Sequence, residues 1–151
     1  MLSAANLAPS WKNSQTTRFY VATGEKSKNA VREALPEFNR KNSENASAYI
    51  VTTVVLNRSG FDKDGTAVTE IGNGWGYYDL GLNNMALLLK ATELGISTLV
   101  MGIRDGEKLR KEFDIPETEA VVSVIAVGYT DSEIVRPKRK SVEDFSKFYE
   151  D

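Results

Sequence analysis

The chain contains one long segment, residues 77–94, that would be apolar on nearly every side if it folded as a helix. Four of its few polar residues share one narrow stripe: Asp79, Asn83, Lys90 and Glu93. A helix of this kind is buried over most of its surface. Gly95 follows directly and predicts the helix end, because glycine readily adopts the left-handed conformation that closes many helices. We therefore expect one face of this helix to pack on a sheet and much of the other to pack on a second subunit.

Four segments rich in β-branched and apolar residues predict the strands of that sheet: 17–23, 48–56, 96–103 and 120–129. The second is an almost continuous apolar run, which indicates burial on both faces. Further helices are predicted at 1–7, 25–35, 105–113 and 142–149, the last from a capping box of Ser141 and Asp144. The segments 37–46 and 57–76 are predicted to be irregular. The alternation of strands and helices predicts one α/β (α+β) domain over 1–151, with helices on both faces of a central sheet.

The absence of two residue types limits the chemistry that the chain can perform. It has no histidine and no cysteine, which excludes disulfides, thiolate nucleophiles, zinc sites built on those residues, and Ser-His-Asp arrangements. If the chain is an enzyme, a cofactor is therefore expected to supply the difficult chemistry.

Charge and hydropathy limit the class of partner. The net charge of −2 gives no basic field for nucleic acid. No apolar stretch reaches the roughly 20 residues needed to cross a membrane, and the N-terminus lacks the pattern of a signal peptide. We expect a cytoplasmic protein without nucleic-acid or membrane partners. The glycine-rich stretch 72–76 is interpreted as a flexible loop rather than a dinucleotide site, because no strand leads into it.

Three local features are candidates for ligand binding. Ser10, Asn13 and Gln15 lie in a polar loop that offers hydroxyl and amide groups to a ligand; the alternative is that Ser10 and Asn13 only satisfy a turn. Met101, Gly102 and Ile103 end a strand, where a glycine lets a ligand approach or simply marks a bulge. The basic run 136–140 contains Lys138 and Arg139, which are suited to a phosphate or form a solvated tail.

These features occur in an order that resembles the FMN-dependent nitroreductase family over residues 1–148. The family pattern Ala-Pro-Ser-x-x-Asn-x-Gln matches residues 8–15. Further matches follow in the family's order: Asp79-Leu80-Gly81, Glu93-Leu94-Gly95-Ile96, Gly102, Ile115-Pro116, Gly128-Tyr129 and the segment 137–144. The family's Arg-x-Ser-x-Arg motif before the first helix has no counterpart in the chain, and its Pro-Trp after the glutamine is Thr16-Thr17 here.

The resemblance implies a three-layer α/β/α sandwich with a central mixed sheet, and a tight homodimer with FMN at the interface between the subunits. Ser10, Asn13 and Gln15 match positions near the flavin. The backbone of Met101, Gly102 and Ile103 matches the stretch that approaches flavin N5. Lys138 and Arg139 match the phosphate ligands.

The resemblance also implies an oxidoreductase. NAD(P)H, as co-substrate, delivers hydride to flavin N5, and a small-molecule acceptor such as a nitroaromatic or a quinone is then reduced. A chain without histidine and cysteine suits this chemistry, because the protein needs only to position the reactants around the cofactor. Two alternatives remain: a flavin-binding module without significant turnover, and a dimeric interaction protein without a cofactor.

Overall fold

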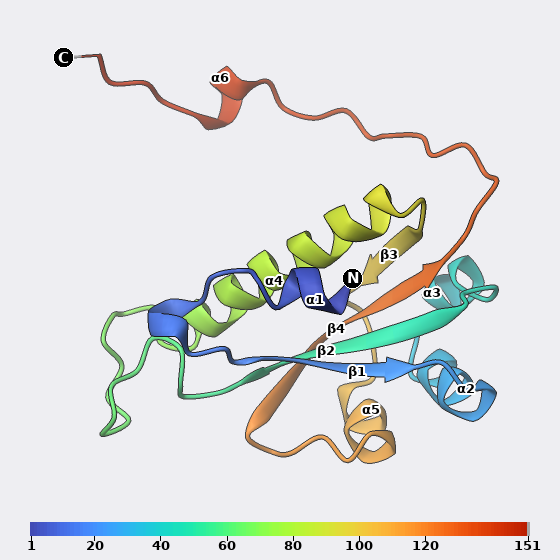
Figure 1. Cartoon of the computed structure of the whole chain (residues 1–151), viewed down its shortest axis with the longest axis horizontal. Helices are drawn as coiled ribbons and strands as arrows, with labels where there is room; N and C mark the ends of the chain where they lie inside the picture. The colour runs from blue at the N-terminus through green and yellow to red at the C-terminus, as the bar shows by residue number, and fades with distance from the viewer. Residues whose placement is uncertain (151) are drawn as a thin grey trace.

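A computed structural model describes residues 1–150, in which four strands form one sheet (Figure 1). The strands are β1 (Thr17–Ala22), β2 (Ala48–Val55), β3 (Ser97–Met101) and β4 (Glu119–Gly128), in the order β1-β2-β4-β3. All the pairings in this sheet are antiparallel, so the expectation of a mixed sheet is wrong for the described strands. The connections β1–β2 and β3–β4 each leave and return at the same end of the sheet, which makes neighbours antiparallel.

Helices cover both faces of this sheet. On one face lie α1 (Leu2–Ala5) and α4 (Gly74–Glu93), whose Ala5 and Leu87 pack against Ile50 and Ile125. On the other face lie α2 (Glu25–Glu33) and α5 (Gly106–Glu112), which enclose a larger core. That core contains Ala22, Val31, Ala34, Leu35, Tyr49, Val51, Met101, Leu109, Ile115, Val121, Val124 and Ala126.

Strand β2 shows why an uninterrupted apolar run indicates two buried faces. Tyr49 and Val51 point into the core beneath α2 and α5, whereas Ile50 between them packs beneath α1 and α4. Successive side chains of a strand alternate between faces, so both faces of a covered strand must be apolar. The prediction of burial on both faces is confirmed.

The long helix α4 ends where the sequence predicts. Gly95 has a φ of +70°, and its N–H donates to the carbonyl of Thr92 at 3.0 Å, while the Ile96 N–H reaches the carbonyl of Ala91 at 2.8 Å. This pair of bonds is the Schellman motif. The helix begins at Gly74, before the predicted start, so the prediction of a flexible loop is wrong for residues 74–76. Gly76 is required there, because a Cβ at this position would lie only 2.8 Å from a methyl group of Val54.

Two predicted helix caps are confirmed, and the prediction that residues 37–46 are irregular is wrong in part. Asp105 accepts the N–H of Lys108 at 3.1 Å and caps α5. Ser141 and Asp144 form the capping box, although α6 (Val142–Phe145) is shorter than predicted. The segment 37–46 is not wholly irregular, because it contains α3 (Glu37–Asn42). This helix lacks an apolar stripe, and its ends carry the charges that suit a helix dipole: Glu37 first, then Arg40 and Lys41.

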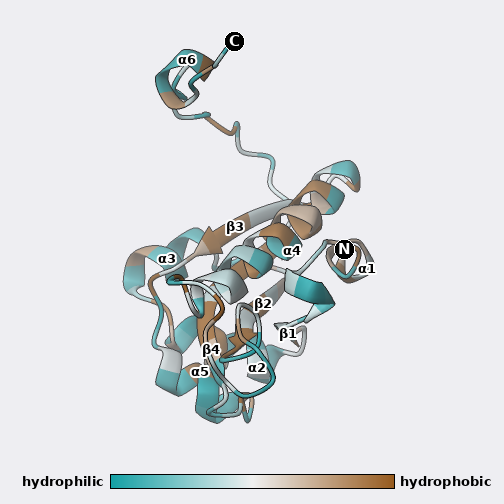
Figure 2. Ribbon diagram, turned by 90° about the vertical axis from the view of Figure 1, so that its left-hand side faces the viewer, coloured by the Kyte–Doolittle hydropathy of each residue, from teal (hydrophilic) through white to brown (hydrophobic). Residues whose placement is uncertain are grey.

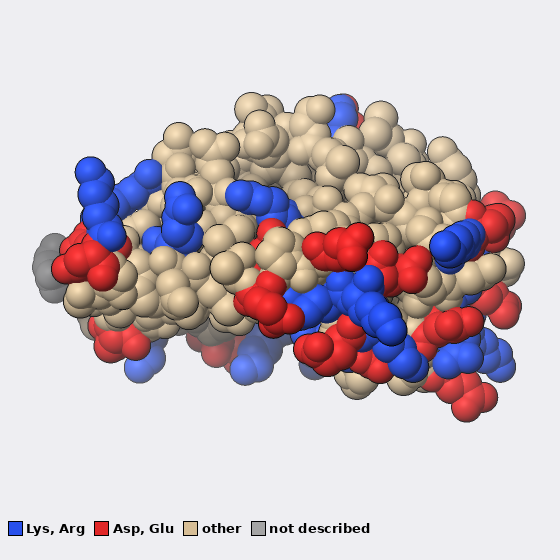
Figure 3. Space-filling model, turned by 90° about the horizontal axis from the view of Figure 1, so that it is seen from below, with Lys and Arg blue, Asp and Glu red and all other residues tan. Residues whose placement is uncertain are grey.

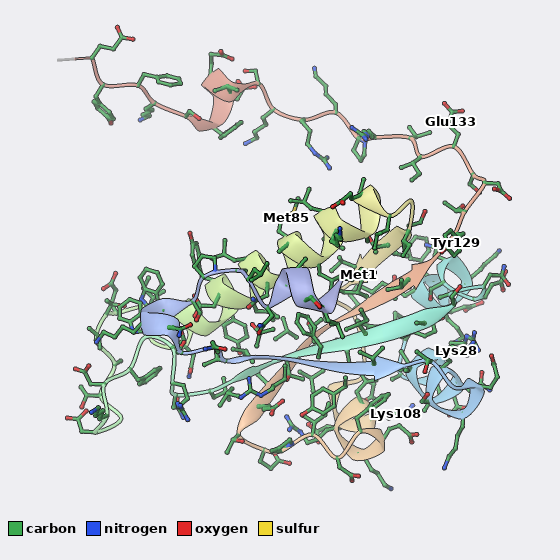
Figure 4. All side chains as sticks on the ribbon, viewed as in Figure 1. Met1, Lys28, Met85, Lys108, Tyr129 and Glu133 are labelled. Carbon is green, nitrogen blue, oxygen red and sulfur yellow. The ribbon has the colours of Figure 1, made fainter. Side chains whose placement is uncertain are left out.

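The two covered faces differ in surface character. Acidic and basic side chains intermingle on the side of α2 and α5 (Figure 3). Apolar residues run along α4 (Figure 2), where Tyr78, Met85 and Leu89 are 60%, 52% and 58% exposed. Met85 points away from the sheet (Figure 4). None of the helices within residues 1–150 is long and apolar enough to cross a membrane.

After Tyr129 the chain leaves the body of the molecule as an extended tail that contains α6 (Figure 1). Its apolar side chains are exposed: Ile134, Val135, Val142, Phe145, Phe148 and Tyr149. Such side chains are normally buried in a folded domain, so this tail presents apolar surface that its own chain does not cover.

Candidate functional site

The loop between α1 and β1 has an unusual backbone. It contains the 3-10 helix η1 (Trp11–Asn13), and three of its residues have a left-handed φ: Lys12 (45°), Asn13 (55°) and Gln15 (48°). The hydroxyl of Ser10 accepts the Gln15 N–H at 3.0 Å. Ser10 therefore does satisfy a turn, as the alternative interpretation proposed, and in doing so it fixes the position of Gln15.

A carboxylate on α4 holds this loop in place. Asp79 is only 2% exposed, and its two oxygens accept the backbone N–H of Trp11 at 3.0 and 3.2 Å. The hydroxyl of Ser59 donates to the same carboxylate. The spacing of Asp79 within a polar stripe was visible in the sequence, but nothing in the sequence indicated that this part of the stripe faces the loop.

The next polar residue of the stripe anchors α1 and β1. Asn83, one helical turn after Asp79, donates its side-chain N–H to the carbonyl of Ala5 at 2.6 Å. It accepts the hydroxyl of Thr17 at 2.5 Å. Asp79 and Asn83 together attach the whole N-terminal segment to α4, which explains why two polar side chains are tolerated at buried positions.

Beside this loop lies a pocket of about 360 Å³. It is lined by Leu2, Asn6, Ala8, Ser10, Gln15, Thr17, Arg18, Phe19 and Asn83. Arg18 donates to the carbonyls of Gln15 and Thr17, each at 2.8 Å, so its guanidinium is fixed at the edge of the pocket. The lining therefore combines hydroxyl, amide and guanidinium groups with apolar surface, the mixture found in small-molecule sites. Asn13 lies outside the lining.

The glycine-rich segment 57–73 contacts the same loop, partly through Trp75 at the start of α4. Trp11 and Trp75 pack with ring centroids 4.7 Å apart, and Lys12 pairs with Asp62 at 3.3 Å. The Trp75 indole N–H donates to Thr69 at 2.8 Å. The sequence predicted a loop here, but it did not indicate that aromatic side chains would attach it to the candidate site.

At the other edge of the sheet, the end of β3 exposes its backbone. A Cβ at Gly102 would meet nothing within 4 Å, and Gly102 has no left-handed φ. Open space, rather than an unusual turn, is therefore what distinguishes this glycine. Met101 is buried, whereas Ile103 is 75% exposed.

Two side chains and one backbone bond fix the strand end. Asn39 of α3 donates to the carbonyl of Ile103 at 3.1 Å, and Arg104 donates to the carbonyl of Gly102 at 3.2 Å. The Asp105 N–H reaches the carbonyl of Ala34 at 2.7 Å. Sequence reasoning missed Asn39, because it lies in the segment that was predicted to be irregular.

The structure does not bring the three predicted features together within one chain. The loop of Ser10, Asn13 and Gln15 precedes β1, whereas Met101, Gly102 and Ile103 end β3, and these strands form opposite edges of the sheet. Lys138 and Arg139 lie in the exposed tail beyond Tyr129 and Glu133 (Figure 4).

A second buried carboxylate lies on the opposite face of the sheet. Glu119 accepts the hydroxyl of Tyr20 at 2.9 Å and that of Thr53. Burial, and then the hydrogen bond to Glu119, raise the pKa of Tyr20 to about 12. This group lies on the face covered by α2 and α5, apart from the pocket, and stabilises the junction of β1, β2 and β4.

Comparison with known proteins identifies a sequence family and solved structures that share this fold. The sequence model of the nitroreductase family matches residues 1–129. No curated protein matches the chain. A nitroreductase family protein from Streptococcus pneumoniae TIGR4 has a TM-score of 0.82 at 21% identity, over 98% of this chain and 86% of that one.

Two further solved structures share the fold. CLA-ER, an enone reductase of gut-bacterial fatty acid saturation, has a TM-score of 0.83 at 20% identity, over 97% of this chain and 83% of its own. An oxidoreductase containing FMN has a TM-score of 0.72 at 25% identity, over 87% of this chain and 64% of its own. Because the family model covers most of the sequence, the chain belongs to the nitroreductase family.

Proposed function

We propose that residues 1–151 form a single FMN-binding domain of an NAD(P)H-dependent oxidoreductase. The observation that carries this proposal is the polar and apolar pocket beside the fixed loop of Ser10 and Gln15, in a chain that belongs to the nitroreductase family. An FMN-containing oxidoreductase with this fold supports the choice of cofactor. When bound, FMN supplies hydride transfer through its N5 atom, which this chain's own side chains cannot provide.

The residues present suit FMN. Ser10, Asn13 and Gln15 offer hydroxyl and amide groups to the polar edge of a flavin or to its ribityl chain. The bare backbone at Gly102 leaves room for a flat ring to approach. Lys138 and Arg139 supply positive charge for the phosphate.

The same proposal includes a homodimer with two equivalent sites. The two halves of the candidate site lie at opposite edges of one sheet, so each site takes its loop from one copy and its strand end from the partner. The exposed apolar face of α4 supplies the contact surface, because monomers rarely leave such a patch in water. The apolar tail supplies further contact area.

The protein's part in the reaction is to bind and orient. The exposed backbone of Gly102 and Ile103 is held by Asn39 and Arg104, so the groups that border the reacting atoms do not shift during a turnover. NAD(P)H would bind beside the cofactor first, and the acceptor would follow it in the same place. Holding the reactants in a fixed geometry can lower the activation barrier substantially.

Cofactor analysis and turnover test this proposal. The purified protein is reconstituted with FMN, and the cofactor released by heat is identified by mass spectrometry. NADH and NADPH oxidation is then followed anaerobically with a nitroaromatic, a quinone and an enone as acceptors. We expect FMN and acceptor-dependent oxidation. FMN without turnover would support the binding-module alternative, and no flavin after reconstitution would contradict the proposal.

A further inference from the structure

Asp79 is a buried carboxylate that has only neutral donors. It forms no ion pair within residues 1–150, and its contacts are the Trp11 N–H and the Ser59 hydroxyl. Burial of a carboxylate is unfavourable unless hydrogen bonds compensate for the lost water. Bonds to a charged acceptor are also stronger than neutral ones. The contact between Asp79 and Trp11 is therefore a strong constraint on the backbone.

The loop that receives this constraint would not hold its shape alone. Lys12, Asn13 and Gln15 each have a left-handed φ, which is unfavourable for a residue with a Cβ. The indole nitrogen of Trp11 and the hydroxyls of Ser14 and Thr16 are buried without a hydrogen-bond partner. A strained backbone persists only where surrounding contacts determine it.

We propose that Asp79 is the positioning residue of the cofactor loop. Through the backbone of Trp11 it keeps Ser10 and Gln15 at the pocket before any ligand arrives, and it is not itself part of the pocket lining. A loop that is already ordered loses less conformational freedom when it binds a ligand. This inference depends on the proposed function, because the ligand whose affinity it raises is FMN.

The experiment compares two buried carboxylates. In Asp79→Asn one acceptor oxygen is lost with almost no change in volume. Glu119→Gln is the matched control, because Glu119 also accepts hydrogen bonds from two donors but lies on the other face of the sheet. Hydrogen exchange at the Trp11 amide is measured without cofactor, and FMN affinity and thermal stability are measured for each variant.

We expect Asp79→Asn to speed exchange at the Trp11 amide at least tenfold and to weaken FMN binding at least tenfold. Glu119→Gln lowers stability but leaves both quantities within about twofold of wild type. Ser59→Ala removes the hydroxyl but keeps the Trp11 contact, so it leaves Trp11 protected and serves as a second control on the loop.

Equal FMN affinity in Asp79→Asn and wild type would overturn the proposal. So would a loss of affinity in Glu119→Gln as large as that in Asp79→Asn, since both would then act through stability alone. If the wild type binds no FMN, the proposed function fails. The Trp11 exchange in the cofactor-free protein then still decides whether Asp79 holds the loop.

Discussion

Tyr20 and Glu119 form a hydrogen bond whose strength depends on the tyrosine keeping its proton. Burial and this bond raise the pKa of Tyr20 from 10.0 to about 12 in the folded protein. A raised pKa means that folding favours the protonated hydroxyl. The resulting stabilisation is complete below pH 10 and is lost as the pH rises through about 12.

We predict that Tyr20→Phe removes the part of the stability loss at alkaline pH that comes from ionisation of Tyr20. The wild type should lose stability relative to Tyr20→Phe between pH 10 and about 12, as followed by the urea midpoint at a series of pH values. Tyr129→Phe is the control, because the Tyr129 side chain is 77% exposed and should leave the wild-type profile unchanged. Parallel profiles for wild type and Tyr20→Phe would show that the hydrogen bond does not couple to folding.

A second residue-scale prediction concerns Arg139. A guanidinium engages two phosphate oxygens at once, so Arg139→Ala should weaken FMN binding by roughly 1.5–3 kcal/mol, the scale of a lost charged hydrogen bond. Titration followed by flavin fluorescence measures the change. Lys147→Ala, in the same tail but outside the basic run, should bind like wild type. Unchanged affinity in Arg139→Ala would mean that the run is a solvated tail.

At the scale of elements, the side chains of α4 lie in three different environments. Leu80, Leu87 and Ala91 are buried against the sheet, Asp79 and Asn83 attach the N-terminal segment, and Tyr78, Met85 and Leu89 form the exposed outer face. The helix can approach β2 closely only because Gly76 has no side chain. The position of the loop 10–15, which Asp79 attaches to α4, therefore depends on how close α4 lies to the sheet.

Gly76→Ala tests this dependence. The new Cβ would lie 2.8 Å from a methyl group of Val54, and such overpacking costs about 1–3 kcal/mol of stability. Urea unfolding measures the loss. Gly106→Ala, in α5, is the control, since its Cβ would make an ordinary 3.9 Å contact with Val121 of β4. A stability loss no larger than that of the control would show that the helix simply moves away.

The sequence predicted elements that depend on local patterns. The apolar pattern and Gly95 located α4, and runs of β-branched and apolar residues located the four strands. Helix α3 was missed because its residues carry no apolar stripe. The mixed sheet that the resemblance implied is wrong for the described strands, and the alternation of elements could not correct it, because it does not specify the ends at which connections return. The pocket residues Ser10 and Gln15 were predicted from a motif. Asp79, Trp75 and Asn39 were not, because their roles depend on contacts between segments distant in the sequence.

At the scale of the whole molecule, the chain leaves two apolar surfaces uncovered. One is the outer face of α4, and the other is the tail beyond Tyr129. On the side of α2 and α5, in contrast, charged side chains of both signs intermingle (Figure 3). This asymmetry indicates which side of the molecule a second copy would contact.

We predict a homodimer that buries more than about 2,000 Å² in total, as obligate interfaces do. Met85→Glu and Leu89→Glu should dissociate it, because each places a charge in an apolar contact, and FMN should be lost with the dimer. Light scattering across a dilution series measures the mass. Phe38→Glu is the control, since Phe38 is 75% exposed and lies on α3 rather than on α4. A monomer that holds stoichiometric FMN would contradict the shared site.

The placement of the loop and the strand end on opposite edges has a genetic consequence. A variant damaged only at Ser10 and Asn13 and a variant damaged only at Gly102 would each be inactive as pure homodimers. When the two are unfolded and refolded together, hybrids form in which both lesions fall in one site and the other site is intact. Random pairing of equal amounts makes about one site in four whole, so about a quarter of the activity should return. Two dead alleles of this protein would then complement each other in one cell.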